Sequence, residues 1–307
     1  MLARLLKTVS FPAVLAVIAC ATTGQFKDDE TTAVQVCSQR DPVDSCDYFG
    51  LVGLQEAIDQ STSDRRILIK TGTYTPTSYR DVPFQDLHVR GAVVVRDRKL
   101  SIEAEQGARL VGSAGFPLSA IVIEDSTVQI SGLTISGFHY AVAEDDTYDG
   151  HGIFTINSDV SLDGVVIEGV AKMALTGREA GRIVARNLTI NKSHLGVWLE
   201  ETAAIDLIDS EIIASESAAV AAYGASSARV ENSLIKGNQD DGLYTEDTAR
   251  IISRETTLQD NSPFGARASG ESVILICGGE VSGNAEDYRE EDAGRVYRNE
   301  VDMCLPG

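Results

Sequence analysis

The chain has 307 residues, of which 43% are hydrophobic, and it carries 26 basic and 46 acidic side chains for a formal net charge of −20. The negative net charge excludes a general nucleic-acid binder and a protein that its surface charge holds on anionic membranes. We therefore expect no nucleic-acid partner.

Residues 1–19 are predicted to be a signal peptide. Arg4 and Lys7 precede the apolar run FPAVLAVIA, which is too short for a membrane-spanning helix but suits the core of a signal sequence. The run ends in Val-Ile-Ala-Cys, which resembles a bacterial lipobox and implies that Cys20 becomes the lipid-bearing first residue of the mature chain. An ordinary secretory signal is the alternative.

The residue after Cys20 bears on the destination of the protein. Ala21 at this position favours the outer membrane by the rule known for enterobacterial lipoproteins. The sequence thus predicts an exported protein with a lipid anchor in the bacterial outer membrane or cell surface, with the periplasm as the alternative location. Residues 21–45 are polar and lack a period, which predicts a lipidated arm or linker over residues 20–49.

Four cysteines remain after Cys20, and export permits them to form disulfides. Three connectivities are open. The pairing Cys37–Cys46 with Cys277–Cys304 closes a short loop near each end of the chain. No Cys-x-x-Cys spacing or neighbouring histidine supports a metal site at these positions.

The segment after residue 50 predicts a helix followed by a strand. Leu54, Ala57 and Ile58 share one helical face, and ILIK then has the pattern of a strand before the turn TGTY. A helix here would cover the open end of a stack of strands.

From residue 120 onward the sequence repeats with a period of about 23 residues. Short β-branched runs are separated by Gly, Asn, Asp and Ser, and no run is long enough for a helix. The regular Leu and Asn framework of a leucine-rich repeat is absent. The period therefore predicts an all-β solenoid, a parallel β-helix with strands stacked at roughly 4.8 Å. Apolar residues recur at steps of 32, 23, 23, 22, 23 and 23, at Ile135, Ile167, Ile190, Ile213, Ile235, Leu258 and Val281.

The helix LQEAID followed by RRILIKTGTY resembles the start of pectin-lyase-like right-handed β-helix proteins. The resemblance implies a single-stranded right-handed parallel β-helix over residues 50–285, with an N-terminal capping helix and a C-terminal tail or cap over residues 286–307. Such proteins include polysaccharide lyases, glycosidases, epimerases and proteins without known chemistry. The resemblance therefore implies a fold but no particular activity.

Three asparagines share the period of the repeat, at Asn238, Asn261 and Asn284. Stacked asparagines can hydrogen-bond from coil to coil and tolerate the left-handed backbone of a tight turn. We expect them to form a ladder. Three unrelated turn asparagines are the alternative.

The alternation along each strand predicts which side chains face solvent. The inward columns are expected to hold Ile153, Ala174, Val197, Val220, Leu243 and Ala266, then Thr155, Thr176, Leu199, Ala222, Thr245 and Ala268. The outward columns are expected to hold Phe154, Leu175, Trp198, Ala221, Tyr244 and Arg267, then Gly177, Glu200, Tyr223, Glu246 and Ser269. Trp198, the only tryptophan in the chain, is thus predicted to lie on the surface.

This outward surface combines aromatic rings with carboxylates. Rings stack on the apolar faces of sugars and carboxylates accept hydrogen bonds from hydroxyls, so the leading hypothesis is noncatalytic binding of a neutral or cationic glycan, or of another envelope component. Outward aromatics also suit strands in general, or are covered by a loop such as the insertion HYAVAEDDTYDGH. A structural or partner-binding protein is a further alternative. The expected ligand-binding residues are Phe154, Trp198, Glu200, Tyr223, Tyr244, Glu246 and Arg267.

A polysaccharide lyase or glycoside hydrolase on the same face is the catalytic alternative, with Glu200, Glu246 and Arg267 as the candidate catalytic residues. The two glutamates lie two coils apart, roughly 9.6 Å. This is near the upper limit of the carboxylate separation for inverting hydrolysis, about 6.5–9.5 Å. Outward glutamates on an acidic protein are more often a solvated face, and no catalytic residue can be transferred from the resemblance.

No cofactor is expected, although the acidic loop EDDTYDGH offers carboxylates for Ca²⁺. Asp145, Asp146 and Asp149 are the candidate ligands for this metal. The loop lacks the ligand rhythm and the glycine of an EF-hand, which favours a solvated acidic loop.

Overall fold

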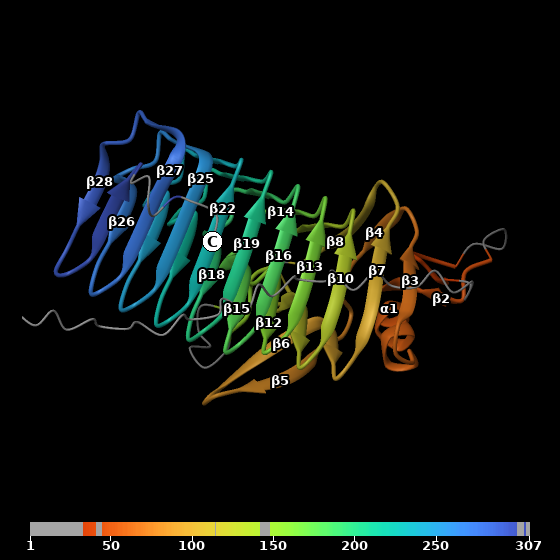
Figure 1. Ribbon diagram of the computed structural model, residues 1–307. Coiled ribbons are helices and arrows are strands. Elements are labelled where there is room, and N and C mark those ends of the chain that lie inside the picture. Colours follow the sequence, from red (N-terminus) through yellow and green to blue (C-terminus); the bar gives the residue numbers. More distant parts are fainter. Residues whose placement is uncertain (1–32, 41–44, 114, 142–147, 300–303, 305–307) are drawn as a thin grey trace, which may run out of the picture. The chain divides into compact units, whose positions relative to one another are not determined.

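The computed structural model describes residues 33–40, 45–113, 115–141, 148–299 and 304, all within one compact unit, Thr32–Gly307 (Figure 1). The predicted signal peptide, Cys20, Asp145 and Asp146 lie outside the described residues. No helix among the described residues is long and apolar enough to cross a membrane.

The chain winds through successive coils that each return to the same three rows of strands, as Figure 1 shows. The pairing between coils is parallel in all three rows, which confirms the parallel β-helix. Two rows belong to a 19-stranded sheet, and the third is a ten-stranded sheet whose first strand pairs antiparallel with the second.

The first row pairs each strand with the strand one coil away. It contains β1 (Val34–Cys37), β3 (Arg65–Ile69), β7 (Lys99–Ala104), β10 (Thr127–Ser131), β13 (Asp159–Asp163), β16 (Arg182–Arg186), β19 (Ala204–Ile208), β22 (Ser227–Glu231), β25 (Arg250–Gln259), β27 (Val273–Ser282) and β29 (Arg295–Arg298).

The second row consists of shorter strands and the later halves of β25 and β27. Its other members are β4 (Gly72–Tyr74), β8 (Ala108–Val111), β11 (Thr134–Ser136), β14 (Val166–Glu168), β17 (Thr189–Asn191), β20 (Glu211–Ile213) and β23 (Leu234–Lys236).

The ten-stranded sheet forms the third row. It contains β5 (Arg80–Phe84), β6 (Leu87–Arg96), β9 (Ser119–Glu124), β12 (Ile153–Ile156), β15 (Met173–Arg178), β18 (Leu195–Leu199), β21 (Val220–Ala222), β24 (Leu243–Thr245), β26 (Phe264–Ala268) and β28 (Glu286–Glu290).

One apolar core runs through the inside of the coils. Its regular members follow the expected period, with one correction: Ile190 pairs with Ile212 and not with Ile213. Ile212 is fully buried, whereas Ile213 is half-buried on the outer side. The short coil of 22 residues therefore lies one step earlier than predicted.

A left-handed residue opens the tight turn between the first and second rows in successive coils. Gly132, Gly164, Asn187, Asp209 and Asn232 all have φ between 49° and 68° at this position. Glycine, asparagine and aspartate adopt this conformation at the lowest cost, which explains why these residue types punctuate each repeat.

The predicted asparagine ladder is confirmed. Nδ2 of Asn238 donates to Oδ1 of Asn261 at 2.8 Å, and Nδ2 of Asn261 donates to Oδ1 of Asn284 at 3.2 Å. The left-handed residues of this turn are, however, the ones just before the asparagines, such as Gly237 and Asp260.

The helix α1 (Gly50–Asp59) covers the N-terminal end of the core and buries Leu54, Ala57 and Ile58, as expected. Its buried Gln55 accepts a hydrogen bond from the backbone N–H of Val94 at 2.7 Å and donates to the carbonyl of the same residue at 2.9 Å. The glutamine amide thus satisfies the backbone of Val94 on the edge of β6 (Leu87–Arg96), where β5 no longer pairs with it.

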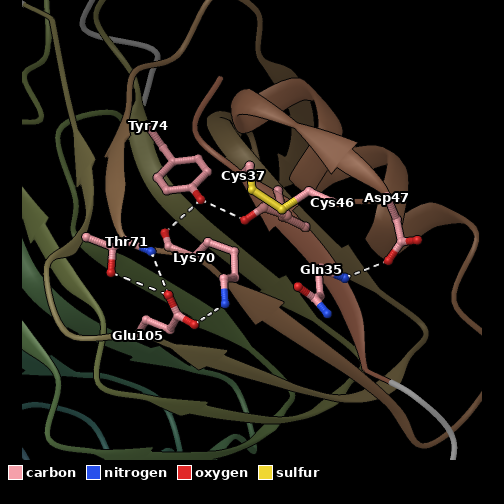
Figure 2. Close-up of a disulfide and its surroundings, with 9 residues drawn as sticks. Gln35, Cys37, Cys46, Asp47, Lys70, Thr71, Tyr74 and Glu105 are labelled. Atoms are coloured by element: carbon pink, nitrogen blue, oxygen red, sulfur yellow. Dashed lines mark hydrogen bonds and ion pairs between the residues drawn. A yellow bond between two sulfur atoms is a disulfide. The ribbon is translucent and has the colours of Figure 1, made fainter. Parts of the chain in front are cut away.

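Both predicted disulfides are present, with Cα–Cα distances of 5.8 Å for Cys37–Cys46 and 5.6 Å for Cys277–Cys304. Around the first, the Tyr74 hydroxyl donates to the carbonyl of Lys70 at 2.8 Å and Glu105 pairs with Lys70 (Figure 2). Disulfides of this kind suggest an extracellular or periplasmic location.

The coils extend beyond the expected range of 50–285 at both ends. β1 pairs with β3, and β2 (Tyr48–Phe49) pairs with β1, so part of the expected arm over residues 20–49 belongs to the solenoid. β28 and β29 pair with β26 and β27, so part of the expected tail over residues 286–307 continues the coils. β28 and β29 consist largely of charged residues and therefore lack the apolar alternation of the other strands.

Candidate functional site

The outer surface of the ten-stranded sheet carries an aromatic ladder, here defined as Trp198, Tyr223, Tyr244 and Arg267. The register of β18, β21, β24 and β26 aligns Trp198, Ala221, Tyr244 and Arg267 in consecutive coils. All four ladder side chains are half-buried. The single tryptophan therefore lies outside the core of the solenoid, where its neighbours are other surface rings.

The ladder members stack on one another along the coil axis. The rings of Trp198 and Tyr223 are 4.3 Å apart at an angle of 28°, and the rings of Tyr223 and Tyr244 are 5.5 Å apart in an edge arrangement. The guanidinium of Arg267 lies 4.3 Å above the Tyr244 ring. These contacts use part of each ring face, so a ligand would meet the remaining faces and the edges.

Two carboxylates bind the polar atoms of the ladder. Nε1 of Trp198 donates to Glu200 at 3.2 Å, and the hydroxyl of Tyr244 donates to Glu246 at 2.7 Å. Glu200 also lies 3.0 Å from the guanidinium of the buried Arg178. The structure thus brings both predicted glutamates to the ladder and gives each of them a partner.

Arg178 contacts a second carboxylate, Glu201, besides Glu200 of the ladder. Its Nη2 donates to Glu201 at 2.6 Å, and its Nε donates to the same carboxylate at 3.0 Å. Burial opposes ionisation of Glu201, but the hydrogen bonds and charge of Arg178 lower its pKa overall.

A buried ion pair, Asp241–Arg267, lies at the far end of the ladder. Nη2 and Nε of Arg267 approach one oxygen of Asp241 at 2.7 and 2.8 Å, and the other oxygen is buried without a hydrogen-bond partner. Burial raises the pKa of Asp241 to about 7, against the opposing charge of Arg267. The sequence reading missed Asp241, because it stands before β24 and outside the alternation.

The tyrosines of the ladder are held in their neutral form. Burial, followed by the charge of Glu246, raises the pKa of Tyr223 to about 12. Burial also raises the pKa of Tyr244, as does its hydrogen bond to Glu246. Both hydroxyls therefore remain protonated and can donate hydrogen bonds over the physiological range.

The prediction that Phe154 belongs to this exposed surface is wrong, because Phe154 is fully buried. The hairpin of β5 and the first part of β6 packs over it and brings Phe84 within 5.6 Å of its ring. Tyr148, which belongs to the insertion HYAVAEDDTYDGH, contacts both rings. Phe154, Phe84, Val82, Val89, Val94, Val122 and Ile156 form a second apolar cluster outside the main core.

The predicted register is also wrong by one residue in β15. Leu175 pairs with Ile153 and is buried inside, whereas Thr176 pairs with Phe154 in the outward column. A Cβ at Gly177 would meet the inner residue Leu199 at 2.9 Å, so Gly177 faces inward and not outward. The coil between β12 and β15 holds 22 residues, which moves Leu175, Thr176 and Gly177 to the face opposite to the predicted one. Ala174, by contrast, lies in the main core as predicted.

The expected calcium candidates receive no support from the described part of the chain. Asp149 is buried and accepts a hydrogen bond from Nε of Arg90 at 2.8 Å, so its carboxylate already has a cationic partner. The described residues contain no group of three or more His, Cys, Asp or Glu side chains that could hold a metal ion.

Comparisons with known proteins agree with the fold. A family model described as a right handed beta helix region matches residues 119–294, more than half of the chain. No curated protein was found to match the sequence.

Among solved structures, the chain is similar to an alginate lyase from Paenibacillus sp. str. FPU-7, with 11% identity, a TM-score of 0.46, and coverage of 85% of this chain and 99% of that chain. It is also similar to the ORF18 protein of Geobacillus virus E2, with 11% identity, a TM-score of 0.45, and coverage of 86% and 61%. A double mutant of the periplasmic alginate epimerase AlgG shares 12% identity, with a TM-score of 0.41 and coverage of 76% and 68%. By the extent of the family match, the chain belongs to the right-handed β-helix family.

Proposed function

We propose that this protein is an exported, lipid-anchored β-helix protein that binds a neutral or cationic glycan, without catalysis, on the aromatic ladder. The observation that carries the proposal is the series of ring contacts from Trp198 to Tyr223 to Tyr244 on three consecutive coils, with each ring half-buried and carboxylates beside them. Ring surfaces provide apolar contact for a sugar, and carboxylates accept hydrogen bonds from its hydroxyls.

The charge around the ladder supports the choice of ligand class. Glu200, Glu201, Glu246 and Asp241 face two arginines, Arg178 and Arg267. Asp240 and Glu291 add further negative charge near Arg267. An anionic chain would be repelled by this excess, whereas a neutral or amino sugar would not.

The contacts of the carboxylates favour binding over catalysis. Glu200 is shared between Trp198 and Arg178, and Glu246 accepts from Tyr244. Asp241 has a raised pKa, but its side chain is sealed from solvent and paired with Arg267. Glu200 and Glu246 therefore already act as hydrogen-bond acceptors within the ladder, which supports a role in binding over a role in proton transfer.

The single tryptophan makes the proposal testable by fluorescence. Titration with a panel of neutral and amino-sugar oligosaccharides should change the emission of Trp198, because a bound sugar would alter the surroundings of its ring. Tyr244→Ala should weaken binding by about tenfold, as expected for loss of one stacking ring worth roughly 1.4 kcal/mol.

Tyr297→Ala is the matched control, since Tyr297 is an exposed ring on β29 in a different row. It should leave affinity unchanged. Equal losses for the two variants, or no response of the parent protein to any glycan, would remove the proposal.

The same samples test the catalytic alternative. A lyase would release unsaturated sugars that absorb ultraviolet light, and a hydrolase would release new reducing ends. Appearance of either product, with loss in Glu200→Gln, would replace noncatalytic binding by enzymatic action at this face.

A further inference from the structure

The outer surface of the first row has a charge opposite to that of the whole protein. Its outward positions from β16 to β29 include six arginines and two acidic residues, although the chain as a whole has 26 basic and 46 acidic side chains. The arginines are Arg182, Arg186, Arg229, Arg250, Arg254 and Arg295, and the acids are Asp206 and Glu231. This surface is a different row from the aromatic ladder.

A hollow of about 170 Å³ lies within this surface. Ala204 and Ser227, which are neighbours on β19 and β22, supply its floor, because their side chains are much shorter than those around them. Arg182 and Arg250 stand at the two ends of the same column, one coil to either side of the floor. Arg229 stands beside Ser227 in the next outward column.

The three arginines of the hollow differ in their ion pairs. Arg182 forms a close pair with Asp206 at 2.5 Å. Arg229 has a longer contact, 3.8 Å, to Glu231. Arg250 forms no ion pair with another described residue. Arg250 therefore borders the floor without an ion pair, whereas Arg229 has a long contact to Glu231 and stands opposite Asp206 in the register. Arg229 and Arg250 are both exposed.

We propose that this hollow binds an oxyanion group, such as a sulfate, carboxylate or phosphate carried on a larger ligand. Guanidinium groups present forked N–H donors that match the oxygens of such groups. Arg229 and Arg250 would supply these donors, and the Ser227 hydroxyl between them would supply another. Asp206 would oppose binding, both by its own charge and by holding Arg182.

The proposed site differs from the glycan site in its position and in the charge of the ligand that it would bind. The ladder is acidic and aromatic, whereas the hollow is basic and has no ring in its lining. A ligand with both neutral sugars and acidic groups would thus meet two surfaces of one solenoid that recognise different parts of it.

The test compares dextran sulfate, carboxymethyl dextran and phosphorylated dextran with unmodified dextran, by calorimetry at low salt. The charged forms should bind more tightly than unmodified dextran, and the form with the highest affinity identifies the preferred group. Binding should weaken as salt is raised, since exposed charges are screened. Equal affinity for charged and unmodified dextran would overturn the proposal.

Two pairs of variants locate the site. Arg250→Ala should weaken binding of the best charged dextran by about fivefold, whereas Arg109→Ala, at an exposed arginine on β8, should not. Asp206→Asn should strengthen binding by a similar factor, whereas Glu56→Gln, at an exposed acid on α1, should not. Identical effects within either pair would show that only net charge matters and would contradict a local site.

These outcomes are distinguishable from failure of the proposed glycan site. Tyr244→Ala changes the ladder alone and should retain binding of the charged dextran. Arg250→Ala should retain the fluorescence response of Trp198 to neutral sugars.

Discussion

Trp198 and Phe154 occupy the same outward column of the ten-stranded sheet, two coils apart, but only Phe154 is sealed from solvent. The difference comes from the hairpin, which covers Phe154 and ends near Gln85, whose side chain donates to Glu201 at 3.1 Å. Beyond this contact the ladder begins. The role of an outward aromatic residue therefore depends on what covers its coil.

Asp241 should make stability depend on pH. Its folded pKa of about 7 lies above the ordinary value of 3.8, so the folded state binds the proton more tightly between these values. This contribution is fully present below about pH 4 and is lost as pH rises toward 7. Relative to Asp241→Asn, the parent protein should lose at least about 1 kcal/mol of unfolding free energy between pH 4 and pH 8, on a scale of roughly 1.4 kcal/mol per pKa unit.

Urea denaturation of both proteins across this range measures the effect. Glu246→Gln provides the comparison, because its carboxylate is half-buried and accepts a hydrogen bond from a neutral tyrosine. A constant difference between the parent and Asp241→Asn would show that Asp241 does not titrate in this range.

At the scale of elements, the asparagine ladder connects neighbouring coils where the chain turns into the ten-stranded sheet. Asn261 accepts from the backbone N–H of Asn238 at 3.2 Å and donates to the carbonyl of Ile235 at 3.1 Å. One side chain thus satisfies backbone groups of the preceding coil that the strands leave unpaired.

Asn261→Ala should destabilise the fold by about 2–4 kcal/mol, because it leaves at least two buried backbone groups without partners. Asn191→Ala, at a half-buried position of β17, should cost much less. Chemical denaturation of the two variants gives the comparison, and similar losses would argue against a structural role for the ladder.

The hairpin of β5 and β6 covers part of the outer surface of the ten-stranded sheet and so limits how far the exposed ladder extends. It packs through Phe84 and Val89 against the outside of the solenoid, in a cluster separate from the main core. The guanidinium of Arg178 lies 4.7 Å from the Phe84 ring and so connects the hairpin to the glutamates of the ladder.

Phe84→Ala should loosen the hairpin without unfolding the coils. Truncation of a buried phenylalanine removes about 3–5 kcal/mol of packing, and the loss should act locally because the hairpin has its own cluster. Hydrogen exchange should therefore accelerate at Val89 and remain slow at Ile190. Equal acceleration at both residues would show that the hairpin and the coils unfold together.

At the scale of the whole molecule, acidic and basic side chains are divided between surfaces of one solenoid. Acidic side chains surround the ladder, while the outer surface of the first row is rich in arginine. Disulfides near both ends join segments of the solenoid covalently and fit an oxidising environment. The disulfides thus suggest an extracellular or periplasmic location.

The proposed lipid anchor gives a prediction for the complete protein. In bacterial cells, the parent chain should fractionate with membranes, and its mature N-terminal peptide should carry lipid on Cys20 by mass spectrometry. Cys20→Ser should remove the lipid and shift the protein to the soluble fraction, because the excess of acidic side chains would not hold it on anionic lipid. A parent protein whose mature N-terminus lacks lipid would refute the anchor.

The sequence by itself determined the parallel β-helix, the capping helix, the asparagine ladder and the outward position of Trp198. These features recur in every coil, so the same local alternation of side chains produces the same strand orientation in each repeat. The tertiary structure decided the burial of Phe154, the Asp241–Arg267 pair, the register of β15 and the arginine-lined hollow. Each of these depends on a departure from the repeat or on side chains that meet only across coils, and a one-residue change in coil length is enough to exchange the inner and outer faces.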